Sequence, residues 1–104
     1  MPLIKKLSVI EDSYAYTSFT SDYIFLGDVS SLTLSFLCSN NCDLAFEYSI
    51  DEKHEVIYTE TFSIISNTPL SFLNKLVRTR YIRVLITNIP LFSKLLVQGF
   101  YHVY

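Results

Sequence analysis

The sequence predicts an all-β fold, a small antiparallel β-sandwich of jelly-roll type. Apolar and polar residues alternate with a period of two in several short segments, which are rich in β-branched and aromatic residues. These segments recur about ten residues apart with turn residues between them, as is typical of sandwiches and jelly rolls. A chain of 104 residues suffices for one domain. We expect the sandwich over residues 14–104, preceded by an N-terminal arm or edge strand over residues 1–13.

The N-terminal part of the chain predicts short strands. Leu3–Ile10 fits an edge strand whose lysines guard it against aggregation, or an arm that docks on a neighbour. Ser13–Phe19 alternates tyrosines with polar residues and predicts a second strand. Tyr23–Leu26 is a short apolar run, and Gly27 and Asp28 predict a turn after it.

Two strongly alternating segments in the middle of the chain predict a β-hairpin. Leu32–Cys38 and Cys42–Ile50 each place apolar residues at every second position. Ser39–Asn41 separates them and predicts the turn, because asparagine tolerates the left-handed region of backbone space. We therefore expect these two strands to pair with each other.

The C-terminal half of the chain supplies further strands. Val56–Ile64 alternates, but Glu60 shares the parity of its apolar residues, which predicts a bulge or an edge position. Leu70–Val77 fits either a short helix or a strand. Leu95–Val103 predicts the last strand.

The clearest strand in the sequence is Thr79–Asn88. One of its faces carries three successive branched aliphatic residues, and the other is half polar, so that we expect the second face to touch a partner. The aliphatic face consists of Ile82, Val84 and Ile86. The candidates for the contact face are Tyr81, Arg83 and Leu85.

The cysteines and histidines predict no metal site and no catalysis. Cys38 and Cys42 flank the predicted turn and could form a disulfide, or remain two reduced, inward-pointing thiols. His54 and His102 are distant from each other and lack the spacing of zinc ligands. Because no nucleophile, phosphate-loop or metalloprotease motif is present, we expect neither an enzyme nor a cofactor.

The surface chemistry predicts a protein partner. Half of the residues are hydrophobic, and eight tyrosines and eight phenylalanines add large apolar areas. We infer that a partner covers part of the apolar surface. No segment approaches the roughly 18 apolar residues of a membrane span, so no membrane is expected.

The charges are segregated along the chain. All ten acidic residues lie between Glu11 and Glu60, and the five charged residues after Glu60 are all basic. Acidic and basic strands either neutralise each other within the domain, or form oppositely charged faces that stack in an assembly. Nucleic acid is not expected, because the net charge is -2 and a strand places Arg78 and Arg80 on the face opposite Arg83.

From Thr17 to Tyr104 the order of short motifs resembles the jelly-roll and discoidin-like β-sandwich domains of virion and phage-tail structural proteins. A glycine usual after the Ser-x-Asp turn of that pattern is replaced by Glu52, and the tryptophan often found after it is absent. The motifs that carry the resemblance are Phe19-Thr20, Ser31-Leu32-Thr33-Leu34-Ser35, Tyr48-Ser49-Ile50-Asp51, Arg80-Tyr81-Ile82-Arg83-Val84, Thr87-Asn88 and Gln98.

The resemblance implies a viral structural protein, most simply a minor capsid protein of a large DNA virus. Such a protein acts by packing against other capsid proteins or copies of itself, and it resides in the virion after assembly in the host cytoplasm. The alternative is a carbohydrate- or receptor-binding module of a viral fibre or tail. A bound glycan would then stack on loop aromatics, for which the candidates are Tyr23, Phe25 and Phe92.

Overall fold

The computed structural model describes residues 3–25, 30–51, 55–77 and 79–103, with side chains described for 9–25, 31–51, 55–77 and 79–99. Each of its regular elements in these ranges is a strand. The strands are β1 (Leu3–Tyr14), β2 (Phe19–Thr20), β3 (Ile24–Phe25), β4 (Ser30–Cys38), β5 (Cys42–Ser49), β6 (Tyr58–Ile64), β7 (Leu70–Val77), β8 (Tyr81–Thr87) and β9 (Ser93–Val103).

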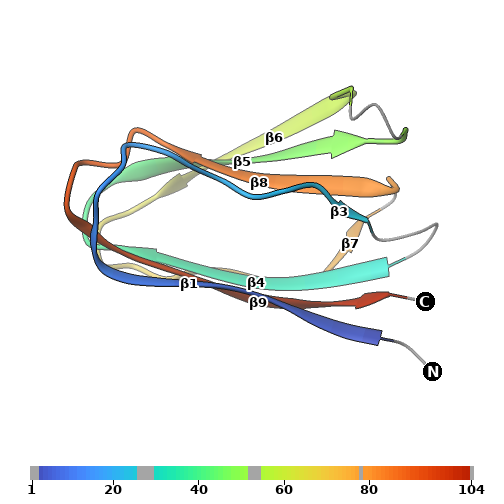
Figure 1. Ribbon diagram of the computed structural model, residues 1–104, viewed down its shortest axis with the longest axis horizontal. Coiled ribbons are helices and arrows are strands. Elements are labelled where there is room, and N and C mark those ends of the chain that lie inside the picture. Colours follow the sequence, from blue (N-terminus) through green and yellow to red (C-terminus); the bar gives the residue numbers. More distant parts are fainter. Residues whose placement is uncertain (1–2, 26–29, 52–54, 78, 104) are drawn as a thin grey trace.

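Two antiparallel sheets pack face to face and confirm the predicted β-sandwich (Figure 1). One sheet has the order β1-β9-β4-β7, and the other has the order β2-β8-β5-β6, with β3 also paired to β8. The first strand therefore pairs with the last, and the following strands pair inward in the same nested way until β5 meets β6. This nesting is the double Greek key of a jelly roll.

The predicted hairpin between Leu32–Cys38 and Cys42–Ile50 is wrong. β4 pairs with β7 and β9, whereas β5 pairs with β6 and β8. The turn at Ser39–Asn41 carries the chain from one sheet to the other, so that the apolar faces of β4 and β5 oppose each other across the core. Alternation marks which face of a strand is buried, but it is the same for a hairpin and for a crossing between sheets.

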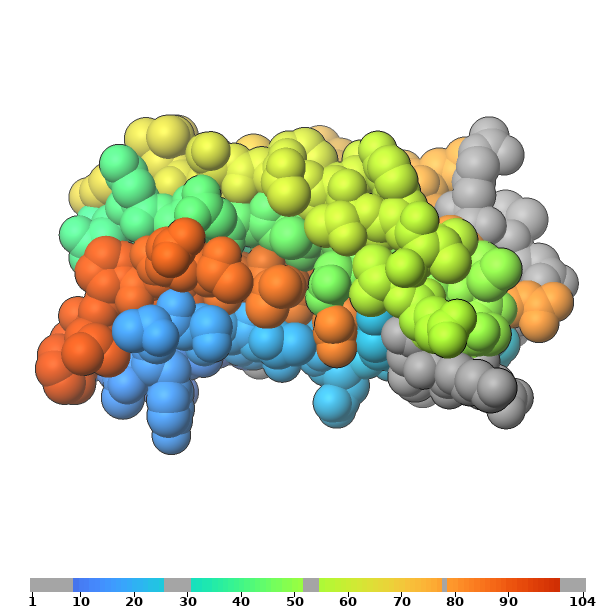
Figure 2. All heavy atoms as spheres, turned by 90° about the horizontal axis from the view of Figure 1, so that it is seen from above, coloured from blue at the N-terminus to red at the C-terminus, as the bar shows by residue number. Residues whose placement is uncertain are grey.

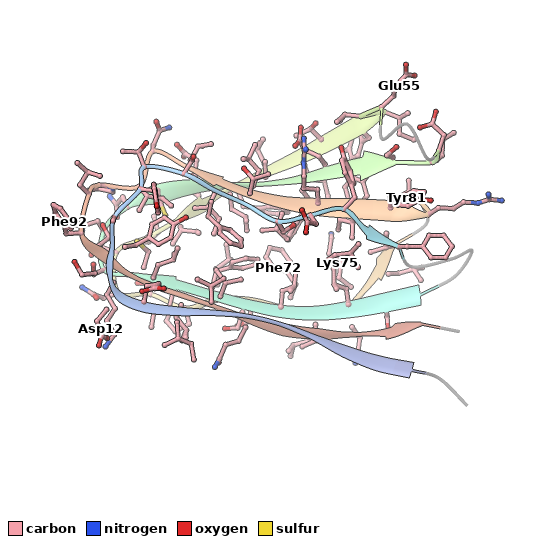
Figure 3. All side chains as sticks on the ribbon, in the orientation of Figure 1. Asp12, Glu55, Phe72, Lys75, Tyr81 and Phe92 are labelled. Carbon is pink, nitrogen blue, oxygen red and sulfur yellow. The ribbon has the colours of Figure 1, made fainter. Side chains whose placement is uncertain are left out.

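The core lies between the sheets and is built from alternate residues of β4, β5 and β8. Its centre is a set of phenylalanines in edge-on and tilted contact, with ring centroids 4.9–6.2 Å apart. Such geometries are the favoured ones for aromatic pairs. The set consists of Phe36, Phe46, Phe62 and Phe72, and Figure 3 shows Phe72 pointing into the space between the sheets.

The ambiguous segments all resolve into sheet. Leu70–Val77 is the strand β7, with a register shift opposite Leu32–Leu34 and a positive φ of 50° at Asn74. β6 lies at the edge of its sheet, which is one of the two alternatives, a bulge or an edge position, that the parity of Glu60 predicts. The N-terminal segment is the long edge strand β1, which pairs with β9. Asparagine also provides left-handed turn residues, with φ of 56° at Asn67 and 58° at Asn88.

Candidate functional site

The predicted contact face lies on the outer side of the central strand β8. Ile82 and Val84 are fully buried in the core, whereas Tyr81, Arg83 and Leu85 are half-buried on the opposite face. β8 pairs with β5 on one side and with β2 and β3 on the other. These neighbours decide which side chains surround the three candidates.

Arg83 is held by partners from two other segments of the chain. Its Nε and Nη2 atoms donate hydrogen bonds of 2.9 and 2.5 Å to Oε1 of Glu47 on β5. Its guanidinium also lies 4.6 Å from the ring centroid of Tyr23, which is cation–π distance. Burial raises the pKa of Tyr23, against the opposing effect of the Arg83 charge. Acidic and basic strands thus neutralise each other at this position.

The strand β3 brings a second aromatic residue to this face. Its register places Phe25 opposite Tyr81, and the two rings lie 5.2 Å apart at 44°. Phe25 is 53% exposed, so most of one large ring faces solvent. Residues expected separately for a protein contact and for a sugar platform therefore form one surface. We call this surface the contact patch; it consists of Tyr23, Phe25, Tyr81, Arg83 and Leu85.

Phe92 does not belong to the contact patch. It lies at the other end of the sandwich from Tyr81, as the two labels in Figure 3 show. Its side chain is 68% exposed and its φ is 63°, because it belongs to the turn that leads into β9. The three expected sugar-platform residues therefore do not converge on one ligand position.

Several large apolar side chains are exposed at the end of the sandwich that carries Tyr81. Register pairs Ser49 with Tyr81 and Tyr48 with Tyr58, so the β5–β6 connection lies beside the contact patch. The segment leading into β6 forms the yellow-green surface at the right of Figure 2. We call this group, which sequence reasoning missed, the apolar end; its members are Ile50, Val56, Ile57 and Tyr58, each at least 42% exposed.

A shallow hollow continues from the contact patch across β5 and β6. Its volume is about 440 Å³, and its lining includes the small side chains of Ala45, Thr61, Ser63 and Thr87. Ala45 lies opposite Leu85 in the register of β5 and β8. A protruding side chain of another protein could enter a surface of this shape.

A second depression, of about 290 Å³, lies where β6 and β7 close the side of the sandwich. There Lys75 of β7 contacts Glu60 of β6 at 3.0 Å, and the Tyr48 hydroxyl donates a hydrogen bond to the same carboxylate. Lys75 also lies 5.6 Å from the ring centroids of Phe46 and Phe72. The ion pair and the hydrogen bond join the two sheets. Because Tyr48, Glu60 and Lys75 bind one another, none of the three is left unpaired for chemistry.

The pKa values in this cluster reflect its internal bonding. Burial alone would raise the pKa of Glu60, but the hydrogen bonds from Tyr48 and Lys75 and the Lys75 charge outweigh it and lower that pKa. Burial and the Glu60 carboxylate raise the pKa of Tyr48. Both shifts favour a charged Glu60 and a neutral Tyr48.

Cys38 and Cys42 are free and buried, so they are the two reduced, inward-pointing thiols and do not form the disulfide. They lie at the crossing between the sheets and not across a hairpin. The side chains of His54 and His102 lie outside the described residues. Among the side chains that are described, no group of three or more His, Cys, Asp or Glu could hold a metal ion.

Comparisons with known proteins identify no relative: no family model, curated protein or solved structure matches this chain. Within the described part of the chain, no helix has the length and apolar character needed to cross a membrane. Inferences about function therefore depend on the geometry of the sandwich and its surface.

Proposed function

We propose that this protein is a structural component of a virus particle, most simply a minor capsid protein. It acts by packing against other capsid proteins or copies of itself, and its location is the virion. Jelly rolls are common in viral capsids, but they also serve as lectin domains, so the fold alone does not select this role.

The observation that carries the proposal is the apolar end together with the adjoining contact patch. Large contiguous apolar surfaces on a small domain mark sites of protein association. Phe25 is half exposed beside Tyr81, and Ile57 and Tyr58 are exposed nearby. Aromatic residues and arginine are the residues that dominate binding energy at interfaces, and the contact patch contains both.

Mass spectrometry of purified particles from the source tests the location. We expect peptides of this chain at a fixed copy number relative to the major capsid protein. Less than one copy of this chain per particle, or no copies, would overturn the virion assignment. A matched preparation treated with protease before lysis separates an internal component from an adsorbed contaminant.

Substitutions in the contact patch test the packing surface. Phe25→Ser removes an exposed ring, and we expect it to lower incorporation into particles about tenfold or more, as the loss of an interface hot spot does. Arg83→Glu should do the same, with circular dichroism to check the fold because the new carboxylate faces Glu47. Phe92→Ser is the matched control, since it removes an exposed ring at the opposite end. Equal incorporation of Phe25→Ser and Phe92→Ser would refute the assignment of this surface.

The second candidate function is a carbohydrate- or receptor-binding module of a viral fibre or tail. The Phe25–Tyr81 pair supports it, because a half-exposed aromatic ring is a surface on which a sugar can stack. A glycan array with the isolated protein distinguishes the two functions. Binding that Phe25→Ser abolishes would favour the module, and an array without signal would count against it.

A further inference from the structure

The four-stranded sheet has one long edge that no described strand covers. β1 is the last strand in the order β1-β9-β4-β7, and it pairs only with β9. That pairing is regular from Leu3 to Glu11, nine residues without a bulge or a proline. An edge of this kind presents a row of backbone donors and acceptors to another strand.

The other edges carry features that block such pairing. β6 and β7 each place a charged residue, Glu60 and Lys75, toward the space between the sheets, and β7 also has a bulge at Asn74. Inward charges and bulges are known protections of edge strands. β2 and β3 are only two residues long each. The edge of β1 is the longest regular edge among the described strands. Lysines protect it against most strands, but not against a strand whose acidic residues lie opposite them.

The charges of β1 are self-complementary in the antiparallel direction. Lys5 and Lys6 lie in its N-terminal half, and Glu11 and Asp12 lie in its C-terminal half. A two-fold axis at Ser8, perpendicular to the sheet, places Lys5 of each copy opposite Glu11 of the other. Asp12 follows the regular part of the pairing, which ends at Glu11, and adds to the negative charge of that half of the strand.

The residues between these charges also fit that register. Leu7 of one copy lies opposite Val9 of the other, and Val9 packs against the core of its own sandwich. Ile10 is 64% exposed, and register pairs it with Leu96, which is paired in turn with Leu37. In the two-fold register Lys6 of the second copy lies opposite Ile10, so the apolar contact across the axis is the pair formed by Leu7 and Val9.

We infer that β1 pairs antiparallel with the β1 of a second copy of this chain, which joins two four-stranded sheets into one continuous sheet of eight. Parallel pairing in register is disfavoured, because it would oppose lysine to lysine and carboxylate to carboxylate. The two-fold dimer consumes both free edges, so the assembly closes and does not grow into a fibre.

This inference deepens the packing role proposed above, because it names the partner and the edge. It is tested on the isolated full chain, whereas the virion assignment is tested on particles. If the chain is a monomer in solution, the virion assignment still stands. If the chain is absent from particles, the dimer still stands.

Sedimentation equilibrium of the full chain tests the pairing. We expect a dimer whose affinity falls as the salt concentration rises, because exposed charge pairs are screened. The double variants K5E/K6E and E11K/D12K should each dissociate about tenfold or more readily, since attraction becomes repulsion in both symmetric halves. Lys94→Glu is the matched control, an exposed charge reversal on β9 that should leave the affinity unchanged.

One mixture and one further variant test whether the charges of β1 hold the two copies together. K5E/K6E mixed with E11K/D12K should form a heterodimer, because one strand is then wholly acidic and the other wholly basic. The quadruple variant K5E/K6E/E11K/D12K should regain the affinity of the wild type, since its pattern is reversed but still self-complementary. A wild type that stays monomeric over its soluble range, or a dimer that neither double variant weakens, would overturn the inference.

Discussion

The two cysteine thiols illustrate how much of a residue's chemistry depends on its place in the fold. Cys38 ends β4 in one sheet and Cys42 begins β5 in the other, so both point into the core at one end of the sandwich. Burial raises the pKa of Cys42 to about 12, and its contact with Cys38 adds to the effect. At neutral pH the reactive thiolate of Cys42 is therefore almost absent.

We predict that neither thiol reacts with an aromatic disulfide reagent such as DTNB while the protein is folded. Reaction requires opening of the core, so the rate should rise by orders of magnitude when denaturant unfolds the chain. Thiol titration with and without denaturant, on protein purified without reductant, measures this. Two thiols per chain in denaturant are expected, and none there would show that the disulfide had formed instead.

Within the strand β9, Gly99 lies very close to the backbone of β4. It lies opposite Leu34 of β4 on one side and Leu7 of β1 on the other. A Cβ atom at this position would lie 2.6 Å from the carbonyl oxygen of Thr33 and 2.3 Å from Cδ2 of Leu34. A side-chain atom can move aside, but the carbonyl belongs to the paired backbone of β4.

We predict that Gly99→Ala lowers the free energy of unfolding by about 1–3 kcal/mol, the usual cost of overpacking. Gln98→Ala is the matched control, because Gln98 is exposed on the same strand and its truncation should change stability by less than about 0.5 kcal/mol. Urea denaturation of both variants measures the difference. Equal stabilities would show that β9 and β4 are not packed this closely.

The whole molecule is closed on one side by the ion pair between Glu60 and Lys75. The two residues belong to the edge strands of different sheets, and their side chains are 27% and 19% exposed. Lys75 also contacts the phenylalanines of the core, so the pair links the surface of the sandwich to its centre. Removing one partner leaves the other charge partly desolvated.

We predict that Glu60→Gln lowers the free energy of unfolding at neutral pH by about 1–2 kcal/mol, less than for a fully buried pair. The folded-state pKa of Glu60 is lowered, so its stabilisation is present above the ordinary glutamate pKa and is lost as the pH falls through the folded value. The stabilities of wild type and variant should therefore converge in acid. Urea denaturation at several pH values measures this, with Glu55→Gln as an exposed control. A constant gap down to low pH would contradict it.

Local alternation is enough to predict the class of the fold and the buried faces of the central strands β4, β5 and β8. Alternation is a local property, and it correctly assigns Ile82 and Val84 to the core and Arg83 to the outer face. It also indicates the edge position of β6, because an inward Glu60 needs solvent or a charged partner within reach.

Which strands pair and which side chains meet depends on how the whole chain packs. Local alternation is identical for a hairpin and for a crossing between sheets, so β4 and β5 were expected in one sheet but lie in two. Glu47 reaches Arg83, and Phe25 reaches Tyr81, through pairings between segments distant in the chain. Such contacts depend on the packing of all the strands together, which no single stretch of sequence encodes.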